Sequence, residues 1–416
     1  MRQVERHIIK RNNPLWKELD RLCFLSKNLY NFANYVVRQE FIFNQTYLGY
    51  NQLYHIVKTT PDYKALPAKI AQQVLKVLDK NWKSFFQANK AYKIEPKLFT
   101  GRPKLPKYKH KTKGRNLLTY TIQAISKVWL RKGIIHLSRT DIKLPTKVKN
   151  IAQARIVPRI GQYVIEIVYD RAESITVVDS TAVAAIDIGV NNLAALTSNQ
   201  IGFIPILVNG RPLKSLNQFY NKTKAKLQSL LRGGKQSSRR IQQLSAKRNN
   251  RVDSYLHSSS TWIINHLDKQ GIGKLVIGKN PLWKQEVNNG KKNNQNFTSI
   301  HHARFVEMLT YKAQLKGIEV LISEESYTSK ASFLDLDFIP VYGTKETIKA
   351  RFSGYRESRG MYKIKGKKVR INADINGSYN ILRKVIPIAF AQGIEGVVVR
   401  PVRVTPGKAK ISQCYI

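Results

Sequence analysis

The first hundred residues carry a helical pattern of hydrophobic positions. Over residues 15–42 apolar side chains, among them Leu19, Leu22 and Leu25, recur at spacings of three and four, which predicts a long helix. The same spacing returns in a second predicted helix that begins at Pro67, after a polar stretch with turn residues. Residues 14–93 are therefore expected to be mainly helical.

A basic loop and a strand-like region follow. Residues 97–116, "KLFTGRPKLPKYKHKTKGRN", combine Pro, Gly, Lys and Arg in a way that excludes a central strand or a regular helix. Short apolar runs come next and predict a small barrel or a meander. They are "LTYTI", "VWLRKGIIHLS", "DIKLP" and "ARIVPRIGQYVIEIVYD".

From about residue 180 the pattern alternates between strands and helices. Three closely spaced apolar runs, "AVAAIDIGV", "LAALTS" and "IGFIPILV", predict strands, the first of them a buried central one. A basic helical region over 214–270, broken at "RGGKQ", predicts a helical hairpin. After it we expect the strand 274–278, a loop through 296, the helix 301–317, the strand "IEVLIS" and a helix from about 375. This order is typical of a ribonuclease H-type domain.

The charge of the chain points to a polyanionic partner. The sequence has 72 Lys and Arg against 26 Asp and Glu, a formal net charge of +46. Such an excess favours nucleic acid, because each neutralised phosphate releases a counterion. The aromatic residues, 20 Tyr, 15 Phe and 5 Trp, include candidates for stacking on unpaired bases, although we expect most of them in the core.

Cysteine usage and hydropathy exclude several other classes. The two cysteines, Cys23 and Cys414, cannot form a disulfide framework or a four-cysteine zinc site within one chain. No apolar run reaches the ~18 residues that a membrane helix needs, and the N-terminal segment has no signal-peptide core. We therefore expect a cytoplasmic protein without a membrane partner, nucleoid-associated when it binds DNA.

Carboxylates stand at the ends of the apolar elements. Asp187 ends the first strand of the second half, Glu324 and Glu325 follow "VLIS", and Asp374 begins the last helix, ahead of "INGSYN". Such a set is suited to Mg²⁺, which prefers oxygen ligands. Each acid alone also has an ordinary interpretation, as a turn residue, a solvated strand end or a helix-capping residue. Only their joint placement favours a metal site.

Three motifs resemble the transposon-encoded TnpB (OrfB) family, which is related to compact type V CRISPR effectors and to Fanzor proteins. The motifs are "AAIDIGVNNLAALTSN", "ESYTSKASF" and "NADINGSYNILRK", in this order. The resemblance implies an RNA-guided DNA endonuclease. A guide RNA would pair with one strand of double-stranded target DNA beside a short flanking motif, and a RuvC-like site would cut with two Mg²⁺ ions, or with Mn²⁺.

The same resemblance implies a multidomain α/β and α+β architecture. Residues 1–13 and 94–178 would form a wedge-like β-barrel, and residues 14–93 a helical recognition domain inserted into it. Residues 179–416 would form the RuvC-like nuclease domain, which includes the helical hairpin and a degenerate zinc-ribbon region over 331–370. That region contains no cysteine, so we expect no zinc, and we interpret Asp335 and Asp337 as loop or capping residues.

Besides lacking the zinc-ribbon cysteines, this chain departs from the family pattern at the second of the three acids. Many relatives carry a glutamate at the end of the fourth strand, where this chain has Gly278 in "KLVIGKN". One interpretation is a nuclease-inactive, RNA-guided DNA-binding repressor. The other is a relocated glutamate, for which the spacing E-x-x-T-S selects Glu325, with Glu324 as the alternative. We therefore predict that Asp187, Glu325 and Asp374 are the catalytic, metal-binding residues.

Basic residues complete the prediction. In the loop before the strand-like region and in the second half, we expect phosphate contacts, although a solvated basic face is the simpler interpretation. The candidates are Lys104, Lys107, Lys109, Lys111, Lys113, Arg248, Arg251 and Lys330.

Overall fold

The computed structural model of the chain is a mixed α/β protein of two compact units, residues 1–172 and 173–416. None of its described helices is long and apolar enough to cross a membrane. The predicted Gly-, Asn- and Lys-rich loop after residue 280 falls largely outside the described residues. These are 1–171, 181–280, 295, 299–344, 350–358, 360–407 and 411–413.

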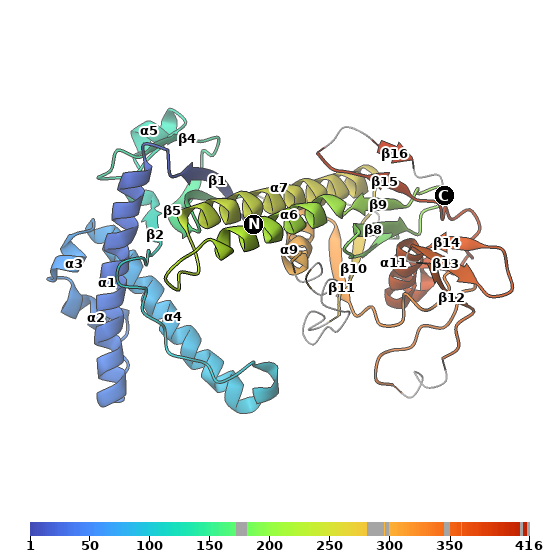
Figure 1. The fold of residues 1–416 in the computed structure, drawn as a ribbon, viewed down its shortest axis with the longest axis horizontal. Coiled ribbons are helices and arrows are strands. Elements are labelled where there is room, and N and C mark those ends of the chain that lie inside the picture. Colours follow the sequence, from blue (N-terminus) through green and yellow to red (C-terminus); the bar gives the residue numbers. More distant parts are fainter. Residues whose placement is uncertain are drawn as a thin grey trace. The chain divides into compact units, whose positions relative to one another are not determined.

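The first unit contains two long helices, as predicted (Figure 1). They pack through apolar faces that include Leu19, Leu22 and Leu78. The fully buried Trp82 donates its indole N–H to Asn34 Oδ1 at 3.0 Å, so the polar group of this side chain is satisfied inside the core. Two short helices occupy the polar stretch with turn residues that separates the two long ones. The four helices are α1 (Trp16–Phe43), α2 (Tyr50–Val57), α3 (Pro61–Lys64) and α4 (Ala68–Ile94).

Strands β2, β5 and β6 of the strand-like region form an antiparallel sheet with the N-terminal strand β1, in the order β1-β6-β5-β2. Among the described strands its outer members, β1 and β2, each pair on one side only, so the predicted barrel is not confirmed. Part of "VWLRKGIIHLS" is the helix α5 (Lys127–Arg131) and not a strand. Gly133, at φ +72°, then turns the chain into a small β3–β4 ribbon. The strands are β1 (Arg2–Lys10), β2 (Leu118–Thr121), β3 (Ile134–His136), β4 (Lys143–Pro145), β5 (Ile151–Arg159) and β6 (Gln162–Asp170).

Asp20 ties helix α1 to both the basic loop and the sheet. Its carboxylate accepts two hydrogen bonds from the guanidinium of Arg115, at 2.9 and 2.8 Å, and one from the hydroxyl of Tyr163 at 2.6 Å. The Arg115 hydrogen bonds outweigh burial and hold the pKa of Asp20 below its ordinary value. This carboxylate therefore stabilises the fold in its ionised form.

We expect Asp20→Asn to lower the free energy of unfolding by about 1–2 kcal/mol, because Arg115 loses its anionic partner at a half-exposed site. Because the folded pKa is depressed, the contribution is present above the unfolded pKa of about 3.9 and lost as pH falls through the folded value. Chemical denaturation between pH 3 and 7 measures this. Asp141→Asn, at an exposed position, should change little; equal losses in both variants would contradict the assignment.

The second unit is built on a seven-stranded sheet with the order β11-β10-β7-β8-β9-β15-β16. Strands β10 and β11 run parallel to β7, and β8 runs antiparallel to both β7 and β9. Strands β15 and β16, the last two at one end of this sheet, were not predicted. The strands are β7 (Val183–Asp187), β8 (Asn192–Ser198), β9 (Ile206–Asn209), β10 (Lys274–Gly278), β11 (Glu319–Ser323), β15 (Val402–Val404) and β16 (Ile411–Gln413).

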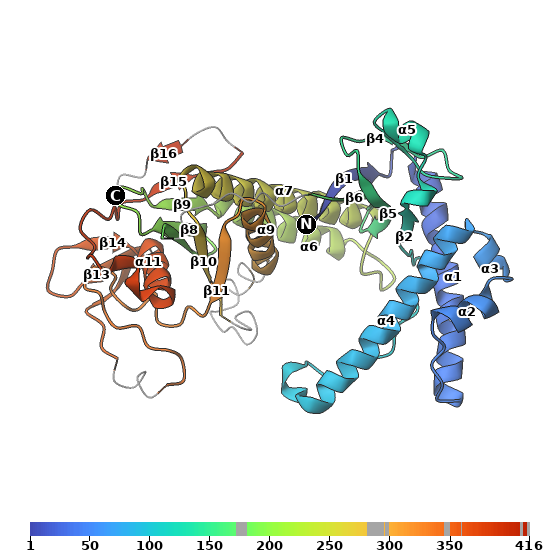
Figure 2. The same ribbon diagram turned by 180° about the vertical axis from the view of Figure 1, so that it is seen from behind.

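Helices cover both faces of this sheet (Figures 1 and 2). One face packs against α7 and α9, and the other against α11. The predicted hairpin is present as α6 and α7. A small antiparallel sheet, β12-β13-β14, precedes α11 and was not predicted, since its strands are short and polar. The elements are α6 (Arg211–Ser229), α7 (Arg239–Lys269), α9 (His302–Gln314), α11 (Ala373–Val385), β12 (Gly354–Ser358), β13 (Met361–Ile364) and β14 (Arg370–Asn372).

Candidate carboxylate site

Strand alternation decides which side chains reach the helix α11. On β7, Ala184 and Ile186 pack toward α7 and α9, whereas Val183 and Ala185 pack toward α11. Successive side chains point to opposite faces, so Asp187 falls on the α11 side. On β10, Val276 belongs to the α11 core, which puts Gly278 on the same side as Asp187.

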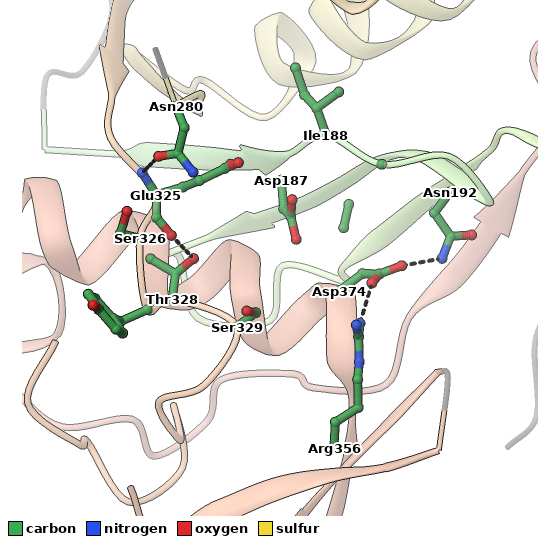
Figure 3. A pocket seen from close by; sticks show the side chains of 13 residues that line it. Asp187, Ile188, Asn192, Asn280, Glu325, Ser326, Thr328, Ser329, Arg356 and Asp374 are labelled. Atoms are coloured by element: carbon green, nitrogen blue, oxygen red, sulfur yellow. Dashed lines mark hydrogen bonds and ion pairs between the residues drawn. The ribbon is translucent and has the colours of Figure 1, made fainter. Parts of the chain in front are cut away.

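Glu325 lies directly over Gly278. A Cβ atom added at Gly278 would stand 2.7 Å from Glu325 Oε2 and 2.5 Å from Ile381 Cδ1, so only glycine leaves room for the carboxylate. The backbone N–H of Glu325 donates to Asn280 Oδ1 at 3.0 Å (Figure 3). Thr328 Oγ1 donates to the Glu325 carbonyl at 2.8 Å, which gives the E-x-x-T spacing a structural reason.

Glu324 has a different environment. Its carboxylate accepts hydrogen bonds from the backbone N–H of Ser326, at 2.8 Å, and from Lys384 Nζ. Burial would raise the pKa of Glu324, but these hydrogen bonds outweigh it and lower the pKa. Glu324 does not line the pocket that Glu325 lines. Its contacts are those of a residue that fixes the turn after β11.

Asp374 stands in the first turn of α11. Asn372 caps the helix, accepting hydrogen bonds through Oδ1 from the N–H groups of Asp374 and Ile375. The carboxylate of Asp374 accepts from Asn192 Nδ2 at 2.7 Å and from Arg356 Nη2 at 3.2 Å (Figure 3). Each of its oxygens thus has a protein donor.

Asp187, Glu325 and Asp374 line one cavity of about 340 Å³ (Figure 3). Burial, followed by the negative charges of Glu325 and Asp374, raises the pKa of Asp187 well above its ordinary value, and Arg356 lowers it. Burial and the charge of Glu324 raise the pKa of Glu325 to about 7. Arg356 is the one cationic side chain among the described residues that line the cavity.

The donor set fits a hard divalent cation. Glu325 Oε2 is buried without a hydrogen-bond partner, and an unsatisfied buried carboxylate oxygen is costly unless a cation contacts it. Among the described residues no three His, Cys, Asp or Glu side chains converge closely enough to hold one ion as they stand. Asp374 is paired with Arg356, and a bound cation would compete with this pairing while compensating the negative charge of the acids.

Helix α11 also holds the segment that carries Glu325. Its buried Asn380 donates to the carbonyl oxygens of Thr328 and Ala331, at 2.9 and 2.8 Å. Asn376 donates to the Ala331 carbonyl and accepts the N–H of Phe333, at 2.8 and 2.9 Å. One turn after Asn380, Lys384 contacts Glu324 and the Ser326 carbonyl. The polar residues of α11 therefore bond the segment 324–333 at several successive points along the helix.

Two small residues of α11 allow the helix to approach the sheet. A Cβ atom at Gly377 would stand 2.8 Å from Asp187 Oδ2. Ser378 Oγ lies 3.0 Å from the Ala185 carbonyl, to which it donates, and 2.9 Å from Thr197 Oγ1. The sequence "DINGSYN" is thus accounted for by its contacts with β7, β8 and residues 328–333.

Several residues of this site were not predicted from the sequence. Asn192, Asn280 and Arg356 line the cavity, and Lys384 holds the turn. Asn192 and Asn280 come shortly after predicted strands, in "GVNN" and "IGKN", and this position could have identified both. Arg356 had no such signal, because β12 was not predicted.

The basic residues occupy different environments. The five loop lysines, Lys104, Lys107, Lys109, Lys111 and Lys113, are all exposed. Side chains of α1 hold the loop by its backbone: Asn31 bonds the N–H and carbonyl of Lys109, Asn34 and Arg38 bond the Pro106 carbonyl, and Lys27 bonds the Lys111 carbonyl. The loop lysines are therefore displayed on a fixed backbone.

In the second unit, Arg251 and Lys330 are exposed, and the Lys330 ammonium lies 5.5 Å from the ring centroid of Tyr327. Arg248 is half-buried and donates to Asn217 Oδ1 and to the Ser299 carbonyl, both at 2.8 Å. Burial lowers the pKa of Arg248. Its hydrogen bonds link α6, α7 and the segment before α9, an arrangement that accounts for the side chain without a phosphate.

We expect Gly278→Ala to lower the free energy of unfolding by about 1–3 kcal/mol, because the new methyl group overlaps Glu325 and Ile381. Gly360→Ala is the matched control, since nothing lies within 4 Å of the position its Cβ would take. Denaturant unfolding of both variants measures the difference. A Gly278→Ala protein as stable as the parent would show that the site has more room than described.

Comparisons with protein families give matches to two stretches of the chain. Residues 166–283 match the family OrfB_IS605, described as a probable transposase, and residues 302–381 match the Cas12f1-like TNB domain. None of the curated proteins matches the chain.

Solved structures give distant likenesses. A cryo-EM structure of a Cas12f1–sgRNA–target DNA complex is 14% identical, with 91% of this chain and 98% of that chain covered, at a TM-score of 0.36. A CRISPR-Cas12f ternary complex is 14% identical (88% and 82% covered, TM-score 0.37). The mini-RNA-guided endonuclease CRISPR-Cas_phi3 is 10% identical (96% and 93%, TM-score 0.43). Because all three TM-scores are below 0.5, no feature of the chain is inferred from these likenesses.

Proposed function

We infer that this TnpB-like chain is an RNA-guided DNA endonuclease. Its residues 166–283 match the OrfB_IS605 family, described as a probable transposase. The observation that carries the inference is the cavity lined by Asp187, Glu325 and Asp374, in which Glu325 Oε2 is buried without a partner. Carboxylates that converge on a cavity with a single cationic side chain are suited to divalent metal and phosphate chemistry.

The sheet order supports a ribonuclease H-type, RuvC-like domain. Along β9-β8-β7-β10-β11, three strands joined as antiparallel neighbours are followed by two strands parallel to β7. The carboxyl ends of β7, β10 and β11 meet at one edge, where Asp187, Gly278 and the Glu325 turn lie. The final helix adds Asp374 at its N-terminal end.

Asp187, Glu325 and Asp374 would hold Mg²⁺, or Mn²⁺, in this site. When bound, the two ions would supply a water nucleophile at neutral pH and stabilise the departing oxygen of the phosphodiester. The protein's own part is to orient the ligands: Asn280 fixes the Glu325 backbone and Asn192 fixes Asp374. Arg356 keeps a cationic donor at the cavity, where a phosphate oxygen could replace Asp374 as its partner.

Guide RNA and double-stranded target DNA are the proposed partners. The net charge of +46 and the exposed lysines of the loop at 104–113 support a polyanion that is contacted through its backbone. In this arrangement base pairing reads the sequence, and the protein supplies charge and shape. The association with a transposable element rests on the probable-transposase family match.

A second candidate function is an RNA-guided DNA-binding repressor without nuclease activity. The observation in its favour is Gly278, which stands where many relatives carry the middle acid. The position of Glu325 over Gly278 favours the endonuclease, since the carboxylate lies on the face of the sheet that carries Asp187.

We expect Glu325→Gln to lower the rate of target cutting by at least ~100-fold with guide RNA and Mg²⁺, because the neutral amide is a poor metal ligand. Target binding should stay within about twofold. Glu319→Gln, at the start of β11 and 56% exposed, is the matched control and should cut normally. Gel analysis of end-labelled DNA with a randomised flanking motif measures cutting, and a filter-binding assay measures affinity.

Glu324→Gln distinguishes the two neighbouring acids. The amide keeps an acceptor for the Ser326 N–H but loses the ion pair with Lys384, so cutting should fall less than in Glu325→Gln. The reverse order would assign the metal to Glu324. A parent protein that binds its target but never cuts it, in Mg²⁺ or Mn²⁺, would favour the repressor.

Replacing Lys104, Lys107, Lys111 and Lys113 together by Gln should weaken guide RNA binding mainly at low salt. Four lost contacts to single-stranded phosphates would reduce the slope of log affinity against log salt by about 3. Binding titrations between 50 and 200 mM KCl measure the slope, and thermal unfolding serves as the control for folding. An unchanged slope would identify the loop as a solvated face.

A further inference from the structure

The segment before α11 is held together by a carboxylate with donors on three sides. Asp335 Oδ2 accepts hydrogen bonds from Ser332 Oγ at 2.9 Å and from Ser353 Oγ at 2.8 Å. Asp335 Oδ1 accepts one from Lys367 Nζ at 2.9 Å. These donors come from three separate parts of the segment, so the carboxylate cross-links them.

Asp337 repeats the same connection through the backbone. Its Oδ2 atom accepts the N–H of Ser332 at 2.7 Å and the N–H of Ser353 at 3.0 Å. The carbonyl of Asp337 in turn accepts a hydrogen bond from Arg383 of α11. Ser332 and Ser353, at the two ends of this stretch, are therefore linked both through Asp335 and through Asp337, and Asp337 is also bonded to the final helix.

The TnpB resemblance implies a four-cysteine zinc ribbon at this place, and the residues present do not fit one. Residues 331–370 contain no cysteine. The Lys367 ammonium already lies on Asp335, in the position that a cation would take. The other groups around Asp335 and Asp337 are hydroxyls and backbone N–H groups, which donate hydrogen bonds to the carboxylates. A zinc ribbon needs electron-donating thiolates around a cation, whereas here hydrogen-bond donors surround an anion.

We propose that Ser332, Asp335, Asp337, Ser353 and Lys367 form a metal-free clasp that replaces the zinc ribbon and positions Arg356 at the carboxylate site. The part that concerns Arg356 rests on the proposed endonuclease function. The part that concerns zinc does not, because it can be tested on the protein alone.

The clasp reaches the site through strand β12. Ser353 directly precedes β12, and Arg356, three residues later, extends its guanidinium to Asp374 Oδ1. Strand β12 packs tightly on β13, since a Cβ atom at Gly354 would stand 2.4 Å from Tyr362 Cε1. Tyr362 donates its hydroxyl to the Lys330 carbonyl at 2.8 Å. Arg356 is therefore placed from two sides.

The clasp is buried enough to matter for this placement. Ser332 is 1% exposed and the side chain of Asp335 is 18% exposed. Burial would raise the pKa of Asp335, but the hydrogen bonds from Lys367, Ser353 and Ser332 outweigh it and lower the pKa. Removing any one of these donors would leave a partly buried charge less well satisfied and so destabilise the folded segment.

Metal content tests the first half of the proposal. The full-length protein, purified from cells grown with added zinc, should contain less than ~0.1 zinc per chain by mass spectrometry of the metal. Its melting temperature should be the same with and without excess EDTA. One zinc per chain together with a chelator-dependent fall in melting temperature would overturn the metal-free clasp.

Variants of the clasp test the second half. In Asp335→Asn we expect backbone amides of residues 350–358 to exchange at least ~10-fold faster, and kcat for cutting to fall about 10-fold with KM unchanged. Lys367→Met should behave in the same way, and Lys367→Arg, which keeps the cation, should restore most of the loss. Asp268→Asn removes a carboxylate paired with Lys316 at 2.7 Å elsewhere in the unit, and should change neither measurement.

The outcomes separate the two proposals. Zinc content and hydrogen exchange are read without nucleic acid, so a protein that never cuts would end the endonuclease proposal and leave the clasp to be judged on exchange alone. Unchanged exchange in Asp335→Asn would overturn the clasp, whether or not the protein cuts. Faster exchange with unchanged kcat would remove its link to Arg356.

Discussion

The candidate site depends on hydrogen bonds from α11 that place three carboxylates around one cavity. Asp374 belongs to this helix, and Asn376, Asn380 and Lys384 fasten the segment on which Glu325 is carried. Leaving such buried amides unsatisfied would cost about 1–3 kcal/mol each, so the segment has little freedom to adopt another path. Burial and the negative charges of Glu325 and Asp374 raise the pKa of Asp187 in this arrangement, and a bound cation would offset both effects.

Much of this arrangement could be predicted from the sequence. Long periodic helices, the hairpin and the apolar strands β7 to β11 follow from hydrophobic spacing, and the acids were found because each stands at the end of such an element. Alternation alone could not choose between Glu324 and Glu325, since it leaves open which face of β11 meets α11. The packing of Leu321 against the α11 core supplies the missing fact: the face of Leu321 is the face of Glu325.

The remainder depends on contacts between distant segments. The sheet β12-β13-β14 is built from short, polar strands without an amphipathic signal, so Arg356 and its contact with Asp374 could not be anticipated. Asp335 and Asp337 were interpreted as loop or capping residues, because the serines and the lysine that bond Asp335 lie up to 32 residues away in the chain. The predicted β-barrel of the first unit is not confirmed, because hydrophobic runs indicate strands but do not show whether the sheet they form closes on itself.

The closeness of α11 to the sheet has a mechanical consequence. Asp374 is part of α11 and Asp187 is part of β7, whereas Glu325 is tied to both, since it follows β11 of the same sheet and Asn380 of α11 bonds its turn. Asp187 and Asp374 therefore belong to two elements that meet at Gly377 and Ser378, where no bulky side chain intervenes. A sliding of α11 along β7 would carry Asp374 away from Asp187, so the spacing of these two acids depends on how closely the helix and the strand pack.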